Sequence, residues 1–143
     1  MEKKSLIYEI KVINGDIFKA ISNRYKNMNV DITPVHAKIS MSIYKSKESL
    51  CQKDLESSMS CNKSTMSAII STMEKNGLLI RKVSDLDSRI NYLELTNKGL
   101  EMALFLKEDR KITEDIMLDG ISDEEYLIFT QIVDKIRRNL ERI

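Results

Sequence analysis

Residues that form tight turns are scarce in this chain of 143 residues, which has four glycines and one proline. An all-β sandwich or barrel needs many such turns, so a mostly helical fold is expected. The two cysteines are too few for a disulfide framework, which indicates a reducing compartment. No run approaches about eighteen apolar residues, and the first residues lack a signal-peptide core. The chain is therefore predicted to be cytoplasmic, with no membrane partner.

The patterns that accompany catalysis and metal binding are also missing. The chain has one histidine, no glycine-rich phosphate loop, no Gly-x-Ser-x-Gly motif and no metal-spaced set of cysteines and histidines. Neither an enzyme nor a resident metal or cofactor is expected. The single histidine, His36, has no acidic neighbour three or four residues ahead. It is expected at the surface, with a place in the wall of a pocket as the alternative.

Charge is distributed unevenly along the chain, although the formal net charge is only +1. Residues 38–98 carry ten lysines and arginines against seven acidic residues, whereas residues 99–143 carry seven against eleven. A polyanionic partner would therefore meet the middle third of the chain.

Apolar residues three and four positions apart predict long helices at both ends of the chain. One should run from Leu6 to about Tyr25, and another from about Thr96 to Gly120. A final helix should follow a capping box in which Ser122 and Glu125 satisfy each other's backbone N–H groups. Its apolar stripe consists of Phe129, Ile132, Val133, Ile136, Leu140 and Ile143.

The middle third predicts three shorter helices followed by a hairpin. The Thr33-Pro34 pair favours a helix over Pro34–Lys45, and a short helix is expected over Gln52–Ser58. A third helix should begin after the cap Asn62 and end at Asn76-Gly77. Strands over residues 79–83 and 90–95 should form a hairpin with a polar tip.

The third of these helices has one apolar face and one face of small polar side chains. The apolar face is formed by Met66, Ile69, Ile70 and Met73. Small hydroxyl-bearing side chains fit the DNA major groove and can read base edges, while lysines at the two ends suit phosphates. An ordinary solvated face is the alternative. The DNA contacts expected on this helix are Asn62, Lys63, Ser64, Thr65, Ser67, Ser71 and Lys75.

The hairpin tip adds two charged residues to the expected DNA-binding surface. Arg89 can enter a narrow minor groove, and Asp87 can orient its guanidinium. Both could instead be simple turn residues. Arg81 in the first strand is expected to be a solvated strand residue first and a phosphate contact second.

Four segments in this order resemble the MarR family of bacterial transcription regulators. They are Asn62-Lys63-Ser64-Thr65-Met66-Ser67, Met73-Glu74-Lys75-Asn76-Gly77-Leu78-Leu79-Ile80-Arg81, Asp87-Ser88-Arg89 and Leu95-Thr96-Asn97-Lys98-Gly99. The resemblance implies a mostly α fold: a winged helix-turn-helix with a two-stranded β-hairpin wing between long terminal dimerisation helices. As a single domain over residues 1–143, it would have its DNA-binding core in residues 33–99. Residues 1–32 and 100–143 would supply the dimerisation helices.

The same resemblance implies a homodimer that binds a pseudo-palindromic site on double-stranded DNA, as a repressor in the favoured interpretation. Two features depart from the family pattern. Leu86 and Ser88 stand where the family often has a second basic residue in the wing, which predicts a weaker wing contact. No cysteine precedes Cys51, whereas a reactive cysteine near the start of the first helix marks the family's peroxide-sensing branch.

The expected signal is a small apolar or phenolic effector that releases the DNA. Candidate contacts are Ile17, His36, Ile39 and Ile43, with Ile10 and Leu104 as further walls. Redox sensing through Cys51, at the start of a short helix, is one alternative. A winged helix that binds a protein instead of DNA is the other. Cys61 is expected to be a buried structural thiol.

Overall fold

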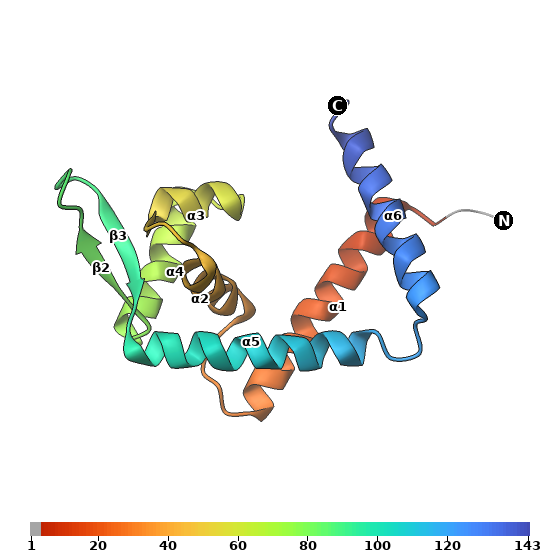
Figure 1. The fold of residues 1–143 in the computed structure, drawn as a ribbon, viewed down its shortest axis with the longest axis horizontal. Coiled ribbons are helices and arrows are strands. Elements are labelled where there is room, and N and C mark those ends of the chain that lie inside the picture. Colours follow the sequence, from red (N-terminus) through yellow and green to blue (C-terminus); the bar gives the residue numbers. More distant parts are fainter. Residues whose placement is uncertain (1–3) are drawn as a thin grey trace. The chain divides into compact units, whose positions relative to one another are not determined.

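The computed structural model describes residues 4–143, and most of them are helical (Figure 1). The chain divides into two compact units, one up to Glu108 and one from Asp109 onward. The first unit holds α1 (Leu6–Asn27), α2 (Pro34–Lys45), β1 (Leu50–Cys51), α3 (Gln52–Ser58), α4 (Lys63–Lys75), β2 (Leu79–Val83) and β3 (Asn91–Leu95). Helix α5 (Asn97–Met117) begins in the first unit and crosses the boundary, and α6 (Asp123–Leu140) belongs to the second. The single domain over residues 1–143 stays a prediction.

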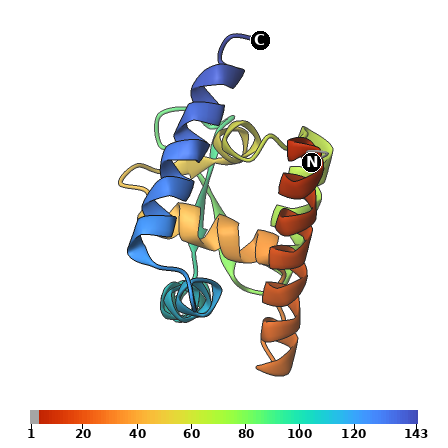
Figure 2. The same cartoon turned by 90° about the vertical axis from the view of Figure 1, so that its right-hand side faces the viewer.

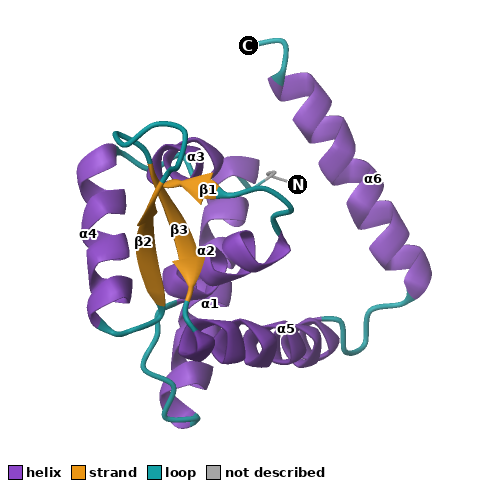
Figure 3. Cartoon of the chain, turned by 60° about the vertical axis from the view of Figure 1, so that its left-hand side comes forward, coloured by secondary structure: helices purple, strands orange, loops and turns teal. Residues whose placement is uncertain are grey.

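The strands form a small antiparallel sheet in the order β1-β3-β2 (Figure 3). In the hairpin Leu79 pairs with Leu95 and Arg81 with Leu93, which confirms the predicted two-stranded wing. Strand β1 pairs Leu50 with Leu93 on the other side of β3 and was not predicted. A strand of two residues is too short to show a period in the sequence.

The main core lies between α2, α3, α4 and the sheet. Its buried members are Ile39, Leu55, Met66, Ile70, Met73, Leu78, Leu79 and Leu93. The predicted stripe of α4 is therefore confirmed, with Ile69 only half-buried at its edge. Residues 34–95, from the start of α2 to the end of β3, are called the winged helix below. This region has an apolar core of its own, on which α4 rests.

A second, smaller cluster joins the helices around the winged helix. Tyr25 of α1, Ala37 of α2 and Leu106 of α5 are its buried members. Helix α1 is one continuous rod in the two perpendicular views (Figures 1 and 2). Its second half carries Ile21 and Tyr25 toward this cluster, while Leu6, Ile7 and Ile10 in the first half are exposed.

The start of α5 is fastened to the turn that follows α4. The Thr96 N–H donates to the Leu78 carbonyl at 3.1 Å, and Lys98 Nζ donates to the Asn76 carbonyl at 2.9 Å. The Thr96 hydroxyl donates to the Gly77 carbonyl. A Cβ atom on Gly99 would lie 1.8 Å from the Leu78 carbonyl oxygen, so only glycine fits here.

The second unit consists of the end of α5 and α6. The predicted capping box of α6 is confirmed, because the Ser122 N–H donates to Glu125 and the Glu125 N–H donates to the Ser122 hydroxyl. No residue of α6 is buried. Helix α5 ends at Met117, three residues before the predicted Gly120. Among residues 4–143, none of the helices has the length and apolar character needed to cross a membrane.

Candidate nucleic-acid interface

Helix α4 begins at a well-made cap. The side-chain oxygen of Asn62 accepts from the Thr65 N–H and from the Ser64 hydroxyl, both at 2.9 Å. This arrangement satisfies an otherwise free donor of the first turn and fixes the start of the helix. Two predicted DNA contacts, Asn62 and Ser64, are therefore already bonded to each other in the DNA-free chain.

The outward face of α4 carries the remaining predicted contacts of this helix. Lys63, Thr65, Ser71 and Lys75 are exposed, and Ser67 is half-buried. The structure thus brings short polar side chains together on one face with lysines at both ends. Such a face has the size and chemistry that a major groove accepts.

The wing tip is a structured turn. Ser84 is buried, and its hydroxyl accepts from the N–H groups of Leu86 at 3.2 Å and Asp87 at 3.4 Å. The turn leaves Leu86 98% exposed. Although this leucine replaces a basic residue of the family pattern, the turn that presents it is held in place by hydrogen bonds.

The predicted pair of Asp87 and Arg89 forms at this tip. Arg89 donates from its backbone N–H, its Nε and its Nη2 to the Asp87 carboxylate, at 3.0–3.1 Å. The side-chain hydrogen bonds from Arg89, with its backbone N–H second, hold the pKa of Asp87 below its ordinary value. The same carboxylate raises the pKa of Arg89. The Arg89 side chain is 88% exposed, so the tip offers an oriented, permanently charged group to solvent.

Arg81 lies in a different environment from the one expected. Its Nε donates to Glu74 at 3.0 Å and its Nη1 lies 3.5 Å from the side-chain oxygen of Gln52. Its side chain is 30% exposed, so the expectation of a mainly solvated strand residue is wrong. No sequence pattern indicates Gln52, because its partners Lys63 and Arg81 lie 11 and 29 residues away in the chain.

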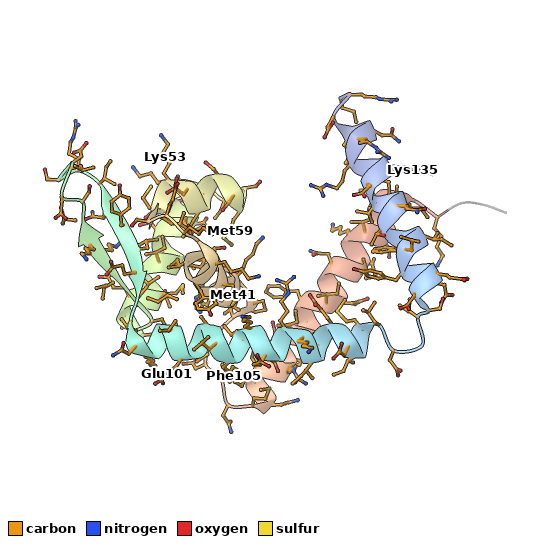
Figure 4. All side chains as sticks on the ribbon, viewed as in Figure 1. Met41, Lys53, Met59, Glu101, Phe105 and Lys135 are labelled. Atoms are coloured by element: carbon orange, nitrogen blue, oxygen red, sulfur yellow. The ribbon has the colours of Figure 1, made fainter. Side chains whose placement is uncertain are left out.

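A hollow of about 730 Å³ opens between the wing and the starts of α3 and α4. Its wall contains the cations Lys53, Lys63, Arg81 and Arg89, against a single carboxylate, Glu56. Lys53 lies at the start of α3 (Figure 4). It was not among the predicted contacts. A concave wall with an excess of positive charge attracts polyanions.

Both cysteines are free thiols. Cys51 is half-buried in the wall of the hollow, and it occupies the N-cap position of α3 as expected. Its N–H donates to Asp54 at 2.8 Å, and this hydrogen bond is the main cause that lowers the pKa of Asp54. Cys61 is half-buried against the main core, so it is less enclosed than predicted.

The predicted effector contacts are spread over different parts of the first unit. His36 is only 9% exposed, so its expected surface position is wrong. Its Nδ1 accepts from the Thr33 N–H at 3.4 Å in the capping box of α2, and burial lowers its pKa. Ile39 is fully buried in the main core, Ile43 packs against that core, and Ile17 is half-buried on α1. The further walls Ile10 and Leu104 are exposed. The effector pocket stays a prediction.

Metal binding finds no support in the part of the chain that the structure describes. Residues 4–143 contain no group of three or more His, Cys, Asp or Glu side chains that could hold an ion. The charged residues that gather at the interface are mainly cationic, which suits an anionic partner.

Comparisons with known proteins give a consistent picture. The model of the MarR family matches residues 32–90, which span most of the winged helix. The HTH-type transcriptional regulator MhqR of Bacillus subtilis is 27% identical over 74 residues, 52% of this chain and 51% of that protein. The aligned part is thus about half the length of that relative.

Two solved structures resemble nearly the whole chain. The transcription regulator MarR of Oenococcus oeni is 25% identical, with a TM-score of 0.73 and coverage of 94% of this chain and 99% of that one. The MepR–DNA complex of S. aureus has a TM-score of 0.84 at 18% identity, over 99% of this chain and 100% of that chain. The MarR family model thus matches the winged helix, where the four motifs lie in their expected places, and the chain has the winged-helix fold of solved MarR-family transcription regulators.

Proposed function

We propose that this chain is a transcriptional repressor that binds a pseudo-palindromic DNA operator as a homodimer and is released by a small apolar or phenolic ligand. The observation that carries the proposal is the polar face of α4 beside the arginine-tipped wing, with a cationic hollow between them. No other surface described above combines small polar side chains with clustered cations.

Double-stranded DNA fits both elements. Helix α4 would place Thr65, Ser67 and Ser71 at base edges in the major groove, with Lys63 and Lys75 near phosphates. The wing would carry Arg89 into the neighbouring minor groove. MepR, whose fold this chain shares, was solved with DNA.

A homodimer is supported by the apolar surface of the terminal helices. On α1 the side chains of Ile7 and Ile13 are 81% and 55% exposed, and on α6 those of Leu127 and Phe129 are 56% and 61% exposed. Exposed apolar stripes of this kind mark association surfaces. A second copy would cover both faces and give each half of a pseudo-palindrome its own α4.

DNA binding and dimerisation can be tested together. Fluorescence anisotropy on operator fragments selected from genomic DNA should give an affinity that falls steeply with salt, with a slope of about −0.9 per phosphate neutralised. Lys63→Met and Lys75→Met should each make the slope shallower by about one phosphate. Light scattering at micromolar concentration should give a dimer. A monomer would contradict the two-half-site arrangement, and absent or salt-independent binding would favour a protein partner.

The signal needs its own experiment, because Cys51 lines the hollow and offers an oxidation-based alternative. DNA affinity is measured for the parent and for Cys51→Ser, with peroxide and with a panel of phenolic acids. Release by a phenolic acid in both proteins supports the ligand. Release by peroxide that disappears in Cys51→Ser would instead assign the signal to the thiol.

A further inference from the structure

We propose that Gln52 is a positioning residue that holds the wing and the start of α4 at a fixed separation, an inference that rests on the proposed DNA binding. Its side-chain amide is the junction of three elements. The nitrogen donates to the Lys63 carbonyl at the start of α4, at 3.2 Å, and to Glu56 of α3 at 2.9 Å. The oxygen faces Arg81 of strand β2 at 3.5 Å.

The chemistry of these partners requires a primary amide at position 52. A backbone carbonyl and a carboxylate can only accept hydrogen bonds, whereas the Arg81 guanidinium can only donate. An amide carries two donors on nitrogen and an acceptor on oxygen, so it satisfies all three at once. A carboxylate would keep the contact with Arg81 and lose the other two. A lysine would keep donors for the Lys63 carbonyl and for Glu56 and would lose the contact with Arg81.

Arg81 extends the connection to the other end of α4. Its Nε donates to Glu74, one residue before the end of the helix, while its Nη1 faces Gln52. One strand residue of the wing is therefore linked to the last turn of α4 directly and to the first turn through Gln52. We call Gln52, Arg81 and Glu74 the brace.

The brace has a clear use in a protein that docks two elements on one duplex. Helix α4 and the wing would enter different grooves, so affinity depends on holding both in the docking geometry before DNA arrives. Loss of the brace would leave Arg89 intact but free to move with the wing. The contact between Arg81 and Gln52, at 3.5 Å, is the longest of the set, so we expect a moderate effect.

A double-mutant cycle separates this role from a direct contact between Gln52 and phosphate. Gln52→Met keeps the size of the side chain and removes every hydrogen bond. It should weaken operator binding about fivefold in the parent, as expected for the loss of about one net hydrogen bond. In the Arg89→Ala background, Gln52→Met should weaken operator binding less than about twofold, because the wing no longer contributes to affinity. Equal losses in the two backgrounds, or no loss in the parent, would overturn the proposal.

Neighbouring substitutions on the same strand provide a matched control. Arg81→Met should behave as Gln52→Met does, including its dependence on Arg89. Lys82→Met removes the same charge from the next residue, but Lys82 pairs with Glu94 at 3.3 Å outside the brace. Lys82→Met should weaken operator binding less than about twofold, both in the parent and in the Arg89→Ala background. If Lys82→Met matched Arg81→Met, charge alone would explain the loss and the brace would be wrong.

A measurement without DNA distinguishes failure of the brace from failure of the proposed function. Amide hydrogen exchange of the full chain should be faster across residues 79–95 in Gln52→Met than in the parent, with α6 unchanged. Unchanged exchange in the wing would overturn the brace even if the protein binds DNA. Faster exchange in a protein that binds no DNA would keep the brace and contradict the proposed function.

Discussion

The winged helix and the terminal helix α6 carry the same kind of apolar stripe and bury it differently. In α4, Met66, Ile70 and Met73 are fully buried. In α6, Phe129 and Leu140 are 61% and 59% exposed at equivalent helical spacing. A periodic stripe therefore predicts that one face of a helix will be covered, and says nothing about which chain covers it.

The winged helix and α6 therefore differ in what stabilises them. The winged helix buries its stripe within one chain, so its fold depends on its own core. Helix α6 exposes its stripe, so in the proposed homodimer its order would depend on association and hence on protomer concentration. The following substitutions test that division, beginning with the largest expected effect.

Gly99→Ala should break the winged helix at its junction with α5. The added methyl would lie 1.8 Å from the Leu78 carbonyl oxygen, and this obstacle is backbone rather than the end of a flexible side chain. We expect a loss of about 3 kcal/mol or more in the free energy of unfolding by urea, at the upper end for overpacking. Gly15→Ala is the control: nothing lies within 4 Å of its added methyl, and it should stabilise α1 by about 0.5–1 kcal/mol. A harmless Gly99→Ala would contradict the close approach.

The double substitution Phe129→Asp and Ile132→Asp should break the other region alone. Both side chains are exposed in the single chain, so charges there should prevent association without disturbing the core of the winged helix. We expect a monomer by light scattering and a loss of operator affinity on the order of 100-fold, because two half-sites no longer bind as one unit. Gln131→Asp on the same helix should remain dimeric. A double variant that stays dimeric would place the interface elsewhere.

Within the proposed DNA-binding surface, Arg89→Ala and Thr65→Ala should have different consequences. Removal of the wing arginine should weaken binding to all operators on the order of tenfold, most where the flanking minor groove is rich in A·T pairs. Removal of the Thr65 hydroxyl should instead change which bases are preferred. Affinity is compared across a library of operator variants. Equal effects of the two substitutions on every sequence would contradict the docking proposed here.

The smallest effect is a pH dependence from His36. Burial lowers its pKa below the ordinary value of 6.5, and a weaker influence of Asp31 opposes this. Between the folded pKa and about pH 6.5 the unfolded chain binds more protons, so stability should fall as the solution is acidified through this range. His36→Gln keeps an acceptor for the Thr33 N–H without a titrating group and should flatten that part of the curve. An unchanged slope in His36→Gln would assign the titration to another group.

How far the sequence predicts the structure depends on how local the signal is. Three helices in the middle of the chain have local signals. Thr33-Pro34 marks the start of α2, the Gln52–Ser58 segment matches α3, and Asn62 caps α4. The Asp87–Arg89 pair was predictable for the same reason, since its members are two residues apart. Strand β1 and the brace were not, because their bonds join residues far apart in the chain.

The position of His36 was mispredicted for a local reason. Its spacing from Thr33 is that of a capping box, but glutamate or glutamine is the usual residue three positions after the cap. A neutral imidazole nitrogen can accept the same hydrogen bond, and this places His36 against the start of α2. The effector contacts could not be settled by pattern alone, because an apolar stripe does not distinguish a core residue such as Ile39 from the wall of a cavity.

Because the start of α5 is hydrogen-bonded to the turn after α4, a rotation of α5 and a rotation of α4 are coupled. With 21 residues, α5 is about 31 Å long at 1.5 Å per residue. A rotation of only about 6° around its fastened end displaces the far end by about 3 Å, close to the 3.4 Å rise of one base pair. In the opposite direction, a slight change of angle imposed at the far end turns the fastened end, and α4 with it. In the proposed homodimer, the distance between the two copies of α4, and hence the operator spacing that the dimer accepts, would therefore be sensitive to small angular changes in α5.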